Sequence, residues 1–154
     1  MSNYEYDFFR SCGAKLAENG YTPIPIKPQT KTPGYYSSGS WQGLKGWGEY
    51  LNTPPSNSEL AQWATWPCAG VGLLTGDIIA VDIDVLDRDL VSKILDYTDE
   101  ILGETPLCRV GLEPKLLLVY RAAERIKKRH RGKVEILGEG QQFVAYGIHP
   151  STKL

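Results

Sequence analysis

The stretch that decides the fold of this chain is Val71-Gly72-Leu73-Leu74-Thr75-Gly76-Asp77-Ile78-Ile79-Ala80-Val81-Asp82-Ile83-Asp84. It predicts two apolar strands joined by a turn at residues 75–77, because short apolar runs bounded by turn residues are typical of buried strands. The second strand ends in Asp82 and Asp84. Since successive side chains of a strand point to opposite faces, these two acids share a face and lie about 7 Å apart along the chain.

Two carboxylates on one face repel each other and lose hydration when they are buried, and a bound cation removes both penalties. Such hard oxygen ligands suit Mg²⁺ or Mn²⁺, which also take phosphate oxygens. The blander interpretation is a polar strand end followed by a helix cap. Position favours the metal, because the apolar run 78–81 is typical of a central strand, and ligands often gather at the C-terminal ends of such strands. We therefore expect a divalent-metal site for a phosphate-bearing substrate.

Length and composition narrow the class of protein. The chain has 154 residues, a formal net charge of −1 and a pI near 6.1. We expect one domain with lobes at roughly 1–68 and 69–154. The charge argues against a uniformly basic nucleic-acid coat protein. The three cysteines form no CxxC pair, and the sequence shows neither a signal-peptide pattern nor an apolar run near the roughly 18 residues of a membrane span. A reduced, cytoplasmic protein without a membrane partner is expected.

The rest of the pattern predicts a mixed α+β arrangement rather than a doubly wound one. Residues 28–53 are predicted as a long loop, in which Trp41 and Trp47 either anchor the loop or contact a base. Helices are expected at residues 3–19, from Ser56 (with Glu59 as a capping box) to Trp66, and from Asp87 to Gly103. Strands are expected at residues 21–26, 107–110, 116–120, 133–137 and 142–146, the last two as a pair across the turn 138–140.

A third acid, Glu135, lies in the apolar strand 134–137. A charge in such surroundings is costly unless it is paired or bound to a metal. One interpretation pairs Glu135 with a nearby lysine such as Lys133. The other joins it to Asp82 and Asp84 in a three-carboxylate cluster. Such a cluster around one or two Mg²⁺ ions supports in-line nucleotidyl transfer, in which the metal activates a 3′-hydroxyl and holds the triphosphate.

Several cations are candidates for phosphate contacts. Arg109 and Lys115 flank the turn before the strand 116–120, and Arg121 closes that strand. His149 follows the last strand and either serves a structural role or contacts a phosphate or sugar. The run from Arg121 to Lys133 is a solvated face or a nucleic-acid contact, and its candidate nucleic-acid-binding residues are Lys127, Lys128, Arg129 and Arg131. The sequence contains neither a P-loop nor a dinucleotide-binding glycine motif.

An ordered set of motifs resembles a known family. The motifs are Gly20–Pro28 with Lys31 and Pro33, Gly70–Gly76 with Val81–Asp84, Arg109–Gly111 with Pro114-Lys115 and Tyr120-Arg121, and Val134–Gly138 with Gly140–Pro150. They are similar to the N-terminal domain of bifunctional DNA primase/polymerases (prim-pol), which belongs to the archaeo-eukaryotic primase superfamily of phages, prophages and plasmids. The match spans nearly the whole chain.

The resemblance implies an N-terminal αβ lobe packed on an RRM-like catalytic lobe with a mixed or antiparallel sheet. Asp82 and Asp84 correspond to the first acidic motif and Glu135 to the third, which makes them the expected catalytic, metal-binding residues. The second motif of the family is often Ser-x-His, and no such triplet occurs between residues 84 and 135. Arg109 and Lys115 are the candidates for its nucleotide-binding role. Further candidate nucleotide contacts in the matching motifs are Lys31, Arg121, Gln142 and His149.

The expected function is therefore template-directed nucleotidyl transfer with Mg²⁺ or Mn²⁺, making or extending primers from (d)NTPs on a single-stranded DNA template. Family members generally continue past Pro150, so a C-terminal segment and a helicase domain or protein outside this chain are expected. Two alternatives stay open. One is a non-catalytic nucleic-acid-binding replication module, carried by the basic run and the loop tryptophans. The other is a nucleotide-sugar transferase, since Asp-x-Asp also binds a metal–nucleotide-sugar.

Overall fold

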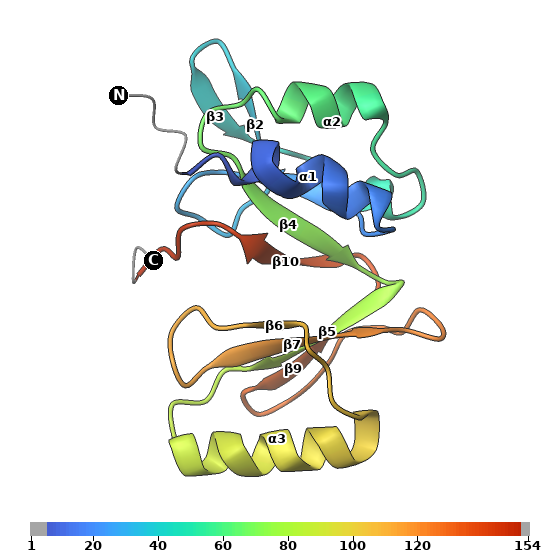
Figure 1. Cartoon of the computed structure of the whole chain (residues 1–154), viewed down its shortest axis with the longest axis vertical. Helices are drawn as coiled ribbons and strands as arrows, with labels where there is room; N and C mark the ends of the chain where they lie inside the picture. The colour runs from blue at the N-terminus through green and yellow to red at the C-terminus, as the bar shows by residue number, and fades with distance from the viewer. Residues whose placement is uncertain (1–5, 152–154) are drawn as a thin grey trace. The chain divides into compact units, whose positions relative to one another are not determined.

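The computed structural model describes residues 6–151 and has an α+β fold (Figure 1). Its helices and strands alternate irregularly along the chain, and its sheets are built from strands of two to six residues. The elements are α1 (Phe8–Glu18), β1 (Pro23–Ile26), β2 (Gly34–Ser37), β3 (Ser40–Gly43), the 3₁₀ helix η2 (Trp47–Leu51), α2 (Asn57–Trp63), β4 (Gly70–Thr75), β5 (Ile78–Ile83), α3 (Arg88–Leu102), β6 (Cys108–Arg109), β7 (Leu116–Arg121), β8 (Arg129–Arg131), β9 (Val134–Leu137) and β10 (Gln141–Tyr146).

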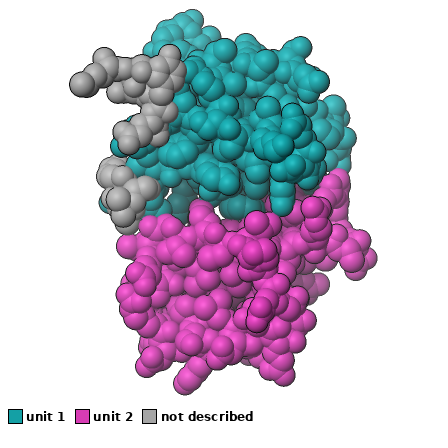
Figure 2. All heavy atoms as spheres, in the orientation of Figure 1, with its two compact units in different colours: residues 1–74, 142–154 teal, residues 75–141 magenta. Residues whose placement is uncertain are grey.

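The chain divides into two compact units (Figure 2). Unit 1 comprises residues 1–74 and 142–154, and unit 2 comprises residues 75–141. This division differs from the expected lobes at 1–68 and 69–154. The physical reason is strand pairing, because β4 forms hydrogen bonds to β1 on one side and to β10 on the other. The last strand therefore returns to unit 1.

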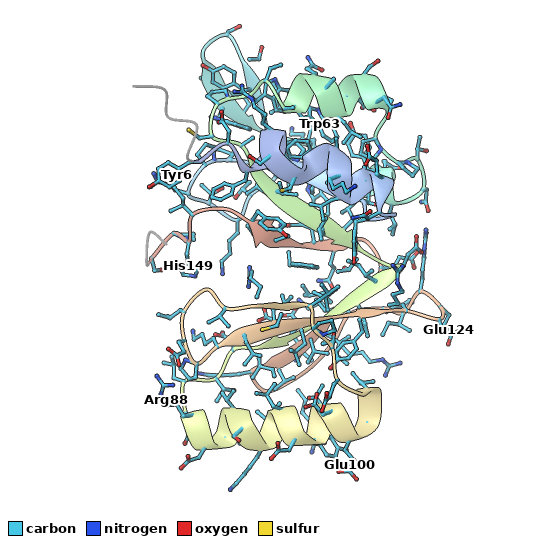
Figure 3. The ribbon with its side chains drawn as sticks, viewed as in Figure 1. Tyr6, Trp63, Arg88, Glu100, Glu124 and His149 are labelled. Atoms are coloured by element: carbon cyan, nitrogen blue, oxygen red, sulfur yellow. The ribbon has the colours of Figure 1, made fainter. Side chains whose placement is uncertain are left out.

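Unit 1 is built on the sheet β1-β4-β10. The four residues of β1 and the six of β4 are all buried, as their apolar sequences predict. Helix α2 begins with the expected capping box, since Ser56 Oγ accepts from the Glu59 N–H and the Glu59 carboxylate accepts from the Ser56 N–H. Trp63, labelled in Figure 3, is only 4% exposed. It packs edge-on against Phe9 of α1, which makes it a core residue.

The segment 28–53 was expected to be a loop, and the structure corrects that expectation. It contains the hairpin β2–β3 and the helix η2. The hairpin closes on Ser38 and Gly39, whose φ angles of 51° and 78° are left-handed. Two successive left-handed residues match the twist of paired strands in a two-residue hairpin turn. The serine at the first position hid this turn, because sequence rules look for Asn or Gly there.

Unit 2 contains the antiparallel sheet β6-β7-β5-β9-β8, with α3 lying along one face (Figure 1). Residues of β5, β7 and β9 pack with Val91, Ile94 and Leu95 of α3 in one apolar cluster. Asp87 precedes the helix as its N-cap, and its carboxylate accepts from the Leu90 N–H. As predicted, β5 is central, between β7 and β9. The antiparallel pairing agrees with the expected mixed or antiparallel sheet, and the RRM-like form of the lobe stays a prediction.

The predicted pairing of strands 133–137 and 142–146 was wrong. β9 pairs with β5 and β8 in unit 2, whereas β10 lies beside β4 in unit 1. The turn 138–140 between β9 and β10 forms hydrogen bonds to Thr75. Thr75 Oγ1 donates to the Gly138 carbonyl, and the Gly140 N–H donates to the Thr75 carbonyl. Within residues 6–151, no helix is both long and apolar enough to cross a membrane.

Candidate active site

Asp82 and Glu135 stand opposite each other on the neighbouring antiparallel strands β5 and β9. The register extends this pair into a row across the sheet of unit 2, with Leu117 opposite Asp82 on the other side, Arg109 opposite Leu117, and His130 opposite Glu135. Residues that face one another across antiparallel strands share a face of the sheet. The row Arg109–Leu117–Asp82–Glu135–His130 therefore lies on one face. It is the face opposite α3, because the alternate residues Val81, Ile83 and Ile136 join the α3 cluster.

Asp84 follows the last residue of β5 and lies two positions beyond Asp82, which places it on the same face where the extended chain continues. Its N–H donates to the Lys133 carbonyl, which continues the pairing with β9. Its carboxylate Oδ1 lies 2.6 Å from Nζ of Lys115. Asp84 is exposed, so this ion pair contributes little to stability. It does place the Lys115 ammonium next to the acids of this face.

Glu135 forms an ion pair with Lys128, so a lysine does partner it, although not the Lys133 that the sequence suggested. Gly138 makes this pairing possible. A Cβ at Gly138 would lie 2.7 Å from the Lys127 carbonyl carbon and 2.8 Å from the Lys128 nitrogen, closer than real Cβ atoms approach. The segment 126–128 thus passes directly over Gly138, and the Glu139 N–H donates to the Ile126 carbonyl. This close approach brings the Lys128 ammonium within reach of Glu135.

Arg109 lies close enough to Asp82 for the two charges to interact. Burial lowers the pKa of the Arg109 guanidinium, and the Asp82 carboxylate opposes that shift in pKa. The guanidinium stays charged, because an arginine pKa is far above neutral. Three acids thus share this region with three cations: Asp82, Asp84 and Glu135 with Arg109, Lys115 and Lys128.

The oxygen donors of this face fit a divalent cation in part. Asp82 and Glu135 offer two carboxylates from adjacent strands, and Mg²⁺ is commonly held by one or two carboxylates together with substrate phosphates. Among the described residues, however, no three His, Cys, Asp or Glu side chains are gathered closely enough to hold a metal ion. Asp84, the third expected ligand, faces Lys115. The three-carboxylate metal centre stays a prediction.

The other candidate residues of unit 2 lie away from the acidic row. Arg121 pairs with Ile78 at the far end of β7, four residues from Leu117, or about 13 Å along the strand. Arg129 and Arg131 flank His130 on β8, so they project to the opposite face, and Arg131 lines an apolar cavity beside α3. Lys127 is exposed. Only Lys128 of the expected nucleic-acid contacts reaches the acids.

Three candidates belong to unit 1. Gln142 Nε2 donates to the Lys31 carbonyl at 3.0 Å, which ties the start of β10 to the turn after β1. His149 Nδ1 accepts from the Ser151 N–H at 3.2 Å. The structure therefore brings Gln142 and Lys31 together, and it gives His149 a local contact.

Sequence reasoning missed His130, which faces Glu135 across β8 and β9. The run Arg129–Arg131 was interpreted by charge alone. Its strand character was signalled by Gly132, whose left-handed φ of 58° begins the two-residue connection to β9. A glycine at the first position of a two-residue loop is a recognised hairpin signal.

An α+β chain with three acids and several cations on one face of an antiparallel sheet is suited to binding phosphate-bearing substrates. Residues 13–153 match the family described as "Bifunctional DNA primase/polymerase, N-terminal". The chain belongs to this Prim-Pol family, and membership points to a primase/polymerase of the nucleotidyltransferase type. No curated protein matches the chain at a significant level.

Proposed function

We propose that this chain catalyses metal-dependent, template-directed nucleotidyl transfer as a DNA primase/polymerase. Membership of the Prim-Pol family supports the reaction class. The observation that best supports the location of the active site is that Asp82 on β5 lies opposite Glu135 on β9. The pair joins acids that are 53 positions apart in the sequence, and like charges placed directly opposite destabilise a sheet. An arrangement of this kind is expected where the acids bind a cation.

Asp82 and Glu135 would hold Mg²⁺ or Mn²⁺, with Asp84 as a third ligand once Lys115 moves aside. When bound, the metal would lower the pKa of a primer 3′-hydroxyl and neutralise charge on the triphosphate. Arg109 would orient a phosphate through its planar guanidinium, and Lys115 and Lys128 would supply point charges. The proposed partners are (d)NTPs, single-stranded template and primer. The proposed setting is phage, prophage or plasmid replication in the cytoplasm, with a helicase outside this chain.

The test is primer synthesis and extension with Asp82→Asn, using Asp96→Asn on the exposed side of α3 as the matched control. Loss of several kcal/mol of charge stabilisation predicts a fall of about 100-fold or more for Asp82→Asn. Asp96→Asn is expected to keep the wild-type rate. Unchanged synthesis by Asp82→Asn would reject the proposed site.

A second candidate is a non-catalytic nucleic-acid-binding module, and one observation favours it. Asp84 and Glu135 are each neutralised by a lysine. If that pairing is permanent, the face serves as a structural charge network. This alternative predicts salt-sensitive DNA binding without nucleotidyl transfer, and the same binding by Asp82→Asn and wild type. Metal-dependent primer extension by the wild-type chain would exclude it.

A further inference from the structure

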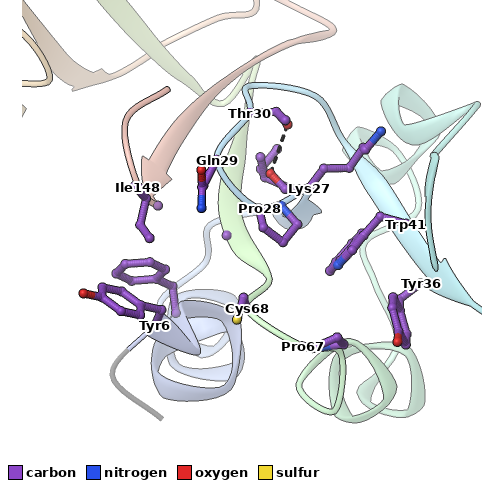
Figure 4. Close-up of a pocket in the computed structure, with 14 residues that line it drawn as sticks. Tyr6, Lys27, Pro28, Gln29, Thr30, Tyr36, Trp41, Pro67, Cys68 and Ile148 are labelled. Atoms are coloured by element: carbon purple, nitrogen blue, oxygen red, sulfur yellow. Dashed lines mark hydrogen bonds between the residues drawn. The ribbon is translucent and has the colours of Figure 1, made fainter. Parts of the chain in front are cut away.

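Unit 1 contains a cavity of about 600 Å³ that the proposed catalytic residues do not use (Figure 4). Its wall is assembled from the start of α1, the turn after β1, the hairpin β2–β3, the turn before β4 and the segment after β10. Trp41 and Tyr36 lie on one side and Tyr6 on the other. The volume is in the range of ordinary ligand sites. Aromatic rings on both sides suit a flat, aromatic guest.

The Trp41 side of the cavity is held by other rings. Trp41 lies 5.8 Å from Trp66 in an edge-on contact and 5.7 Å from Tyr36, measured between ring centroids. Trp66 in turn lies 6.4 Å from Trp63, which is buried in the core. An indole fixed in this way loses little conformational entropy when a ligand stacks on it, which favours binding.

The backbone around the cavity is held in uncommon conformations. Gln29 and Cys68 have left-handed φ angles of 56° and 55°, and both line the cavity. The turn that presents Gln29 is closed because Thr30 Oγ1 donates to the Lys27 carbonyl and the Lys27 N–H donates to the Thr32 carbonyl. Cys68 is fixed because its N–H donates to the Asp7 carboxylate at 2.9 Å. Strained residues that the surroundings hold in place are concentrated at ligand sites.

The charge of the cavity indicates which guest it suits. Lys27 is the one charged side chain among the described residues that line the cavity. A nucleoside triphosphate carries several negative charges and would need more cations, or a metal, for neutralisation. A single strand carries one charge per nucleotide, which one lysine can match.

From these observations we infer that the cavity binds an unpaired base of single-stranded DNA, stacked against Trp41, with its phosphodiester near Lys27. This inference rests on the proposed function, because it supplies a place where the template strand is held. Stacking on an aromatic side chain is tolerant of base identity, as template binding requires.

The test measures binding of a fluorescent single-stranded DNA oligomer that contains 2-aminopurine, in buffer with EDTA and without nucleotides. Trp41→Leu is expected to weaken binding by about 5- to 150-fold and to reduce the quenching of 2-aminopurine. Lys27→Met is expected to reduce the slope of log affinity against log salt by about 0.7. Tyr36→Ser and Tyr35→Ser form a matched pair, since Tyr36 lines the cavity and Tyr35 on the same strand does not. Circular dichroism checks that each variant is folded.

Wild-type binding by folded Trp41→Leu, Tyr36→Ser and Lys27→Met would overturn the inference. So would tight binding of free dAMP or dATP that depends on Trp41 while binding of the oligomer does not. The result is separable from catalysis, because no metal is present. If Asp82→Asn retains primer synthesis while Trp41→Leu loses the oligomer, the catalytic proposal fails and the strand site stands. If Asp82→Asn is inactive and Trp41→Leu binds the oligomer normally, the catalytic proposal stands and the strand site fails.

Discussion

Lys128 and Glu135 form an ion pair on the face of the sheet that also carries Asp82, so the carboxylate proposed to bind a metal already has a lysine partner. Neither side chain is fully buried, with 48% exposed for Lys128 and 31% for Glu135. Partly exposed pairs of this kind are worth about 0–1 kcal/mol. A cation and Lys128 would therefore compete for Glu135 on similar terms.

This competition predicts that Lys128→Met raises the affinity of the metal site. Removal of a pair worth up to about 1 kcal/mol corresponds to binding of Mn²⁺ up to about 5-fold tighter in the absence of nucleotide. Electron paramagnetic resonance of free Mn²⁺ measures the change. Lys127→Met, a neighbouring exposed lysine, is the control and should bind as wild type. Weaker Mn²⁺ binding by Lys128→Met would show that the lysine supports the site.

A methyl group at position 138 is expected to disturb the segment 126–128, which carries Lys128. Gly138→Ala places a Cβ against the backbone of residues 126–128, which cannot move without breaking the bond from the Glu139 N–H to the Ile126 carbonyl. Overpacking of this kind costs about 1–3 kcal/mol. Urea denaturation measures the loss. Gly43→Ala, where the added atom meets nothing within 4 Å, should change stability by less than about 0.5 kcal/mol.

Thr75 is fully buried where β4 gives way to β5, and its hydroxyl donates to the Gly138 carbonyl. Thr75→Val keeps the shape and leaves that carbonyl with one donor fewer. The expected loss in the free energy of unfolding is about 1–3 kcal/mol. Thermal denaturation followed by circular dichroism checks it. Thr75→Ser retains the hydroxyl, so it should recover most of the loss, and a Thr75→Val protein as stable as wild type would show that the bond contributes nothing.

Glu59 makes the stability of unit 1 dependent on pH in the acid range. Backbone and side-chain hydrogen bonds from Ser56 and Tyr50 hold the pKa of the Glu59 carboxyl below its usual value. A depressed pKa means that the stabilisation is present above the unfolded-state pKa of about 4.3 and is lost as pH falls through the folded-state pKa. Glu59→Gln is therefore expected to cost about 1 kcal/mol at pH 7 and progressively less below pH 4. A difference that stays constant down to pH 2 would contradict this.

Tyr50 donates a hydrogen bond to Glu59, and its phenol loses its proton at a higher pH than an ordinary tyrosine. Burial, with the hydrogen bond and charge of Glu59, raises the pKa of its phenol from 10 to about 12. Because the folded-state pKa is raised, the contribution of Tyr50 to stability is complete below pH 10 and is lost as pH rises towards 12. Ultraviolet difference spectra should show one tyrosine that ionises near pH 12 and disappears from that range in Tyr50→Phe. Normal titration of every tyrosine would refute the prediction.

Local elements followed closely from their own residues. The capping box of Ser56 and Glu59 begins α2, and Asp87 caps α3, because each motif satisfies helix N–H groups within one turn. The apolar runs of β5 and β7 form inner strands of their sheet, because short continuous apolar runs are typical of buried strands. The hairpin β2–β3 and the strand β8 were missed, because their polar sequences lack the alternation that marks a half-buried strand.

The sequence by itself determined the helices α1, α2 and α3 and the apolar strands. It also determined the face shared by Asp82 and Asp84, since alternation along a strand is a property of the backbone. It also carried the motifs of the Prim-Pol family. The tertiary structure alone decided that Glu135 stands opposite Asp82, that Lys128 rather than Lys133 reaches Glu135, and that β10 leaves β9 to pair with β4. These are pairings between distant residues. They depend on strand register and on close contacts such as that at Gly138, which local preferences do not specify.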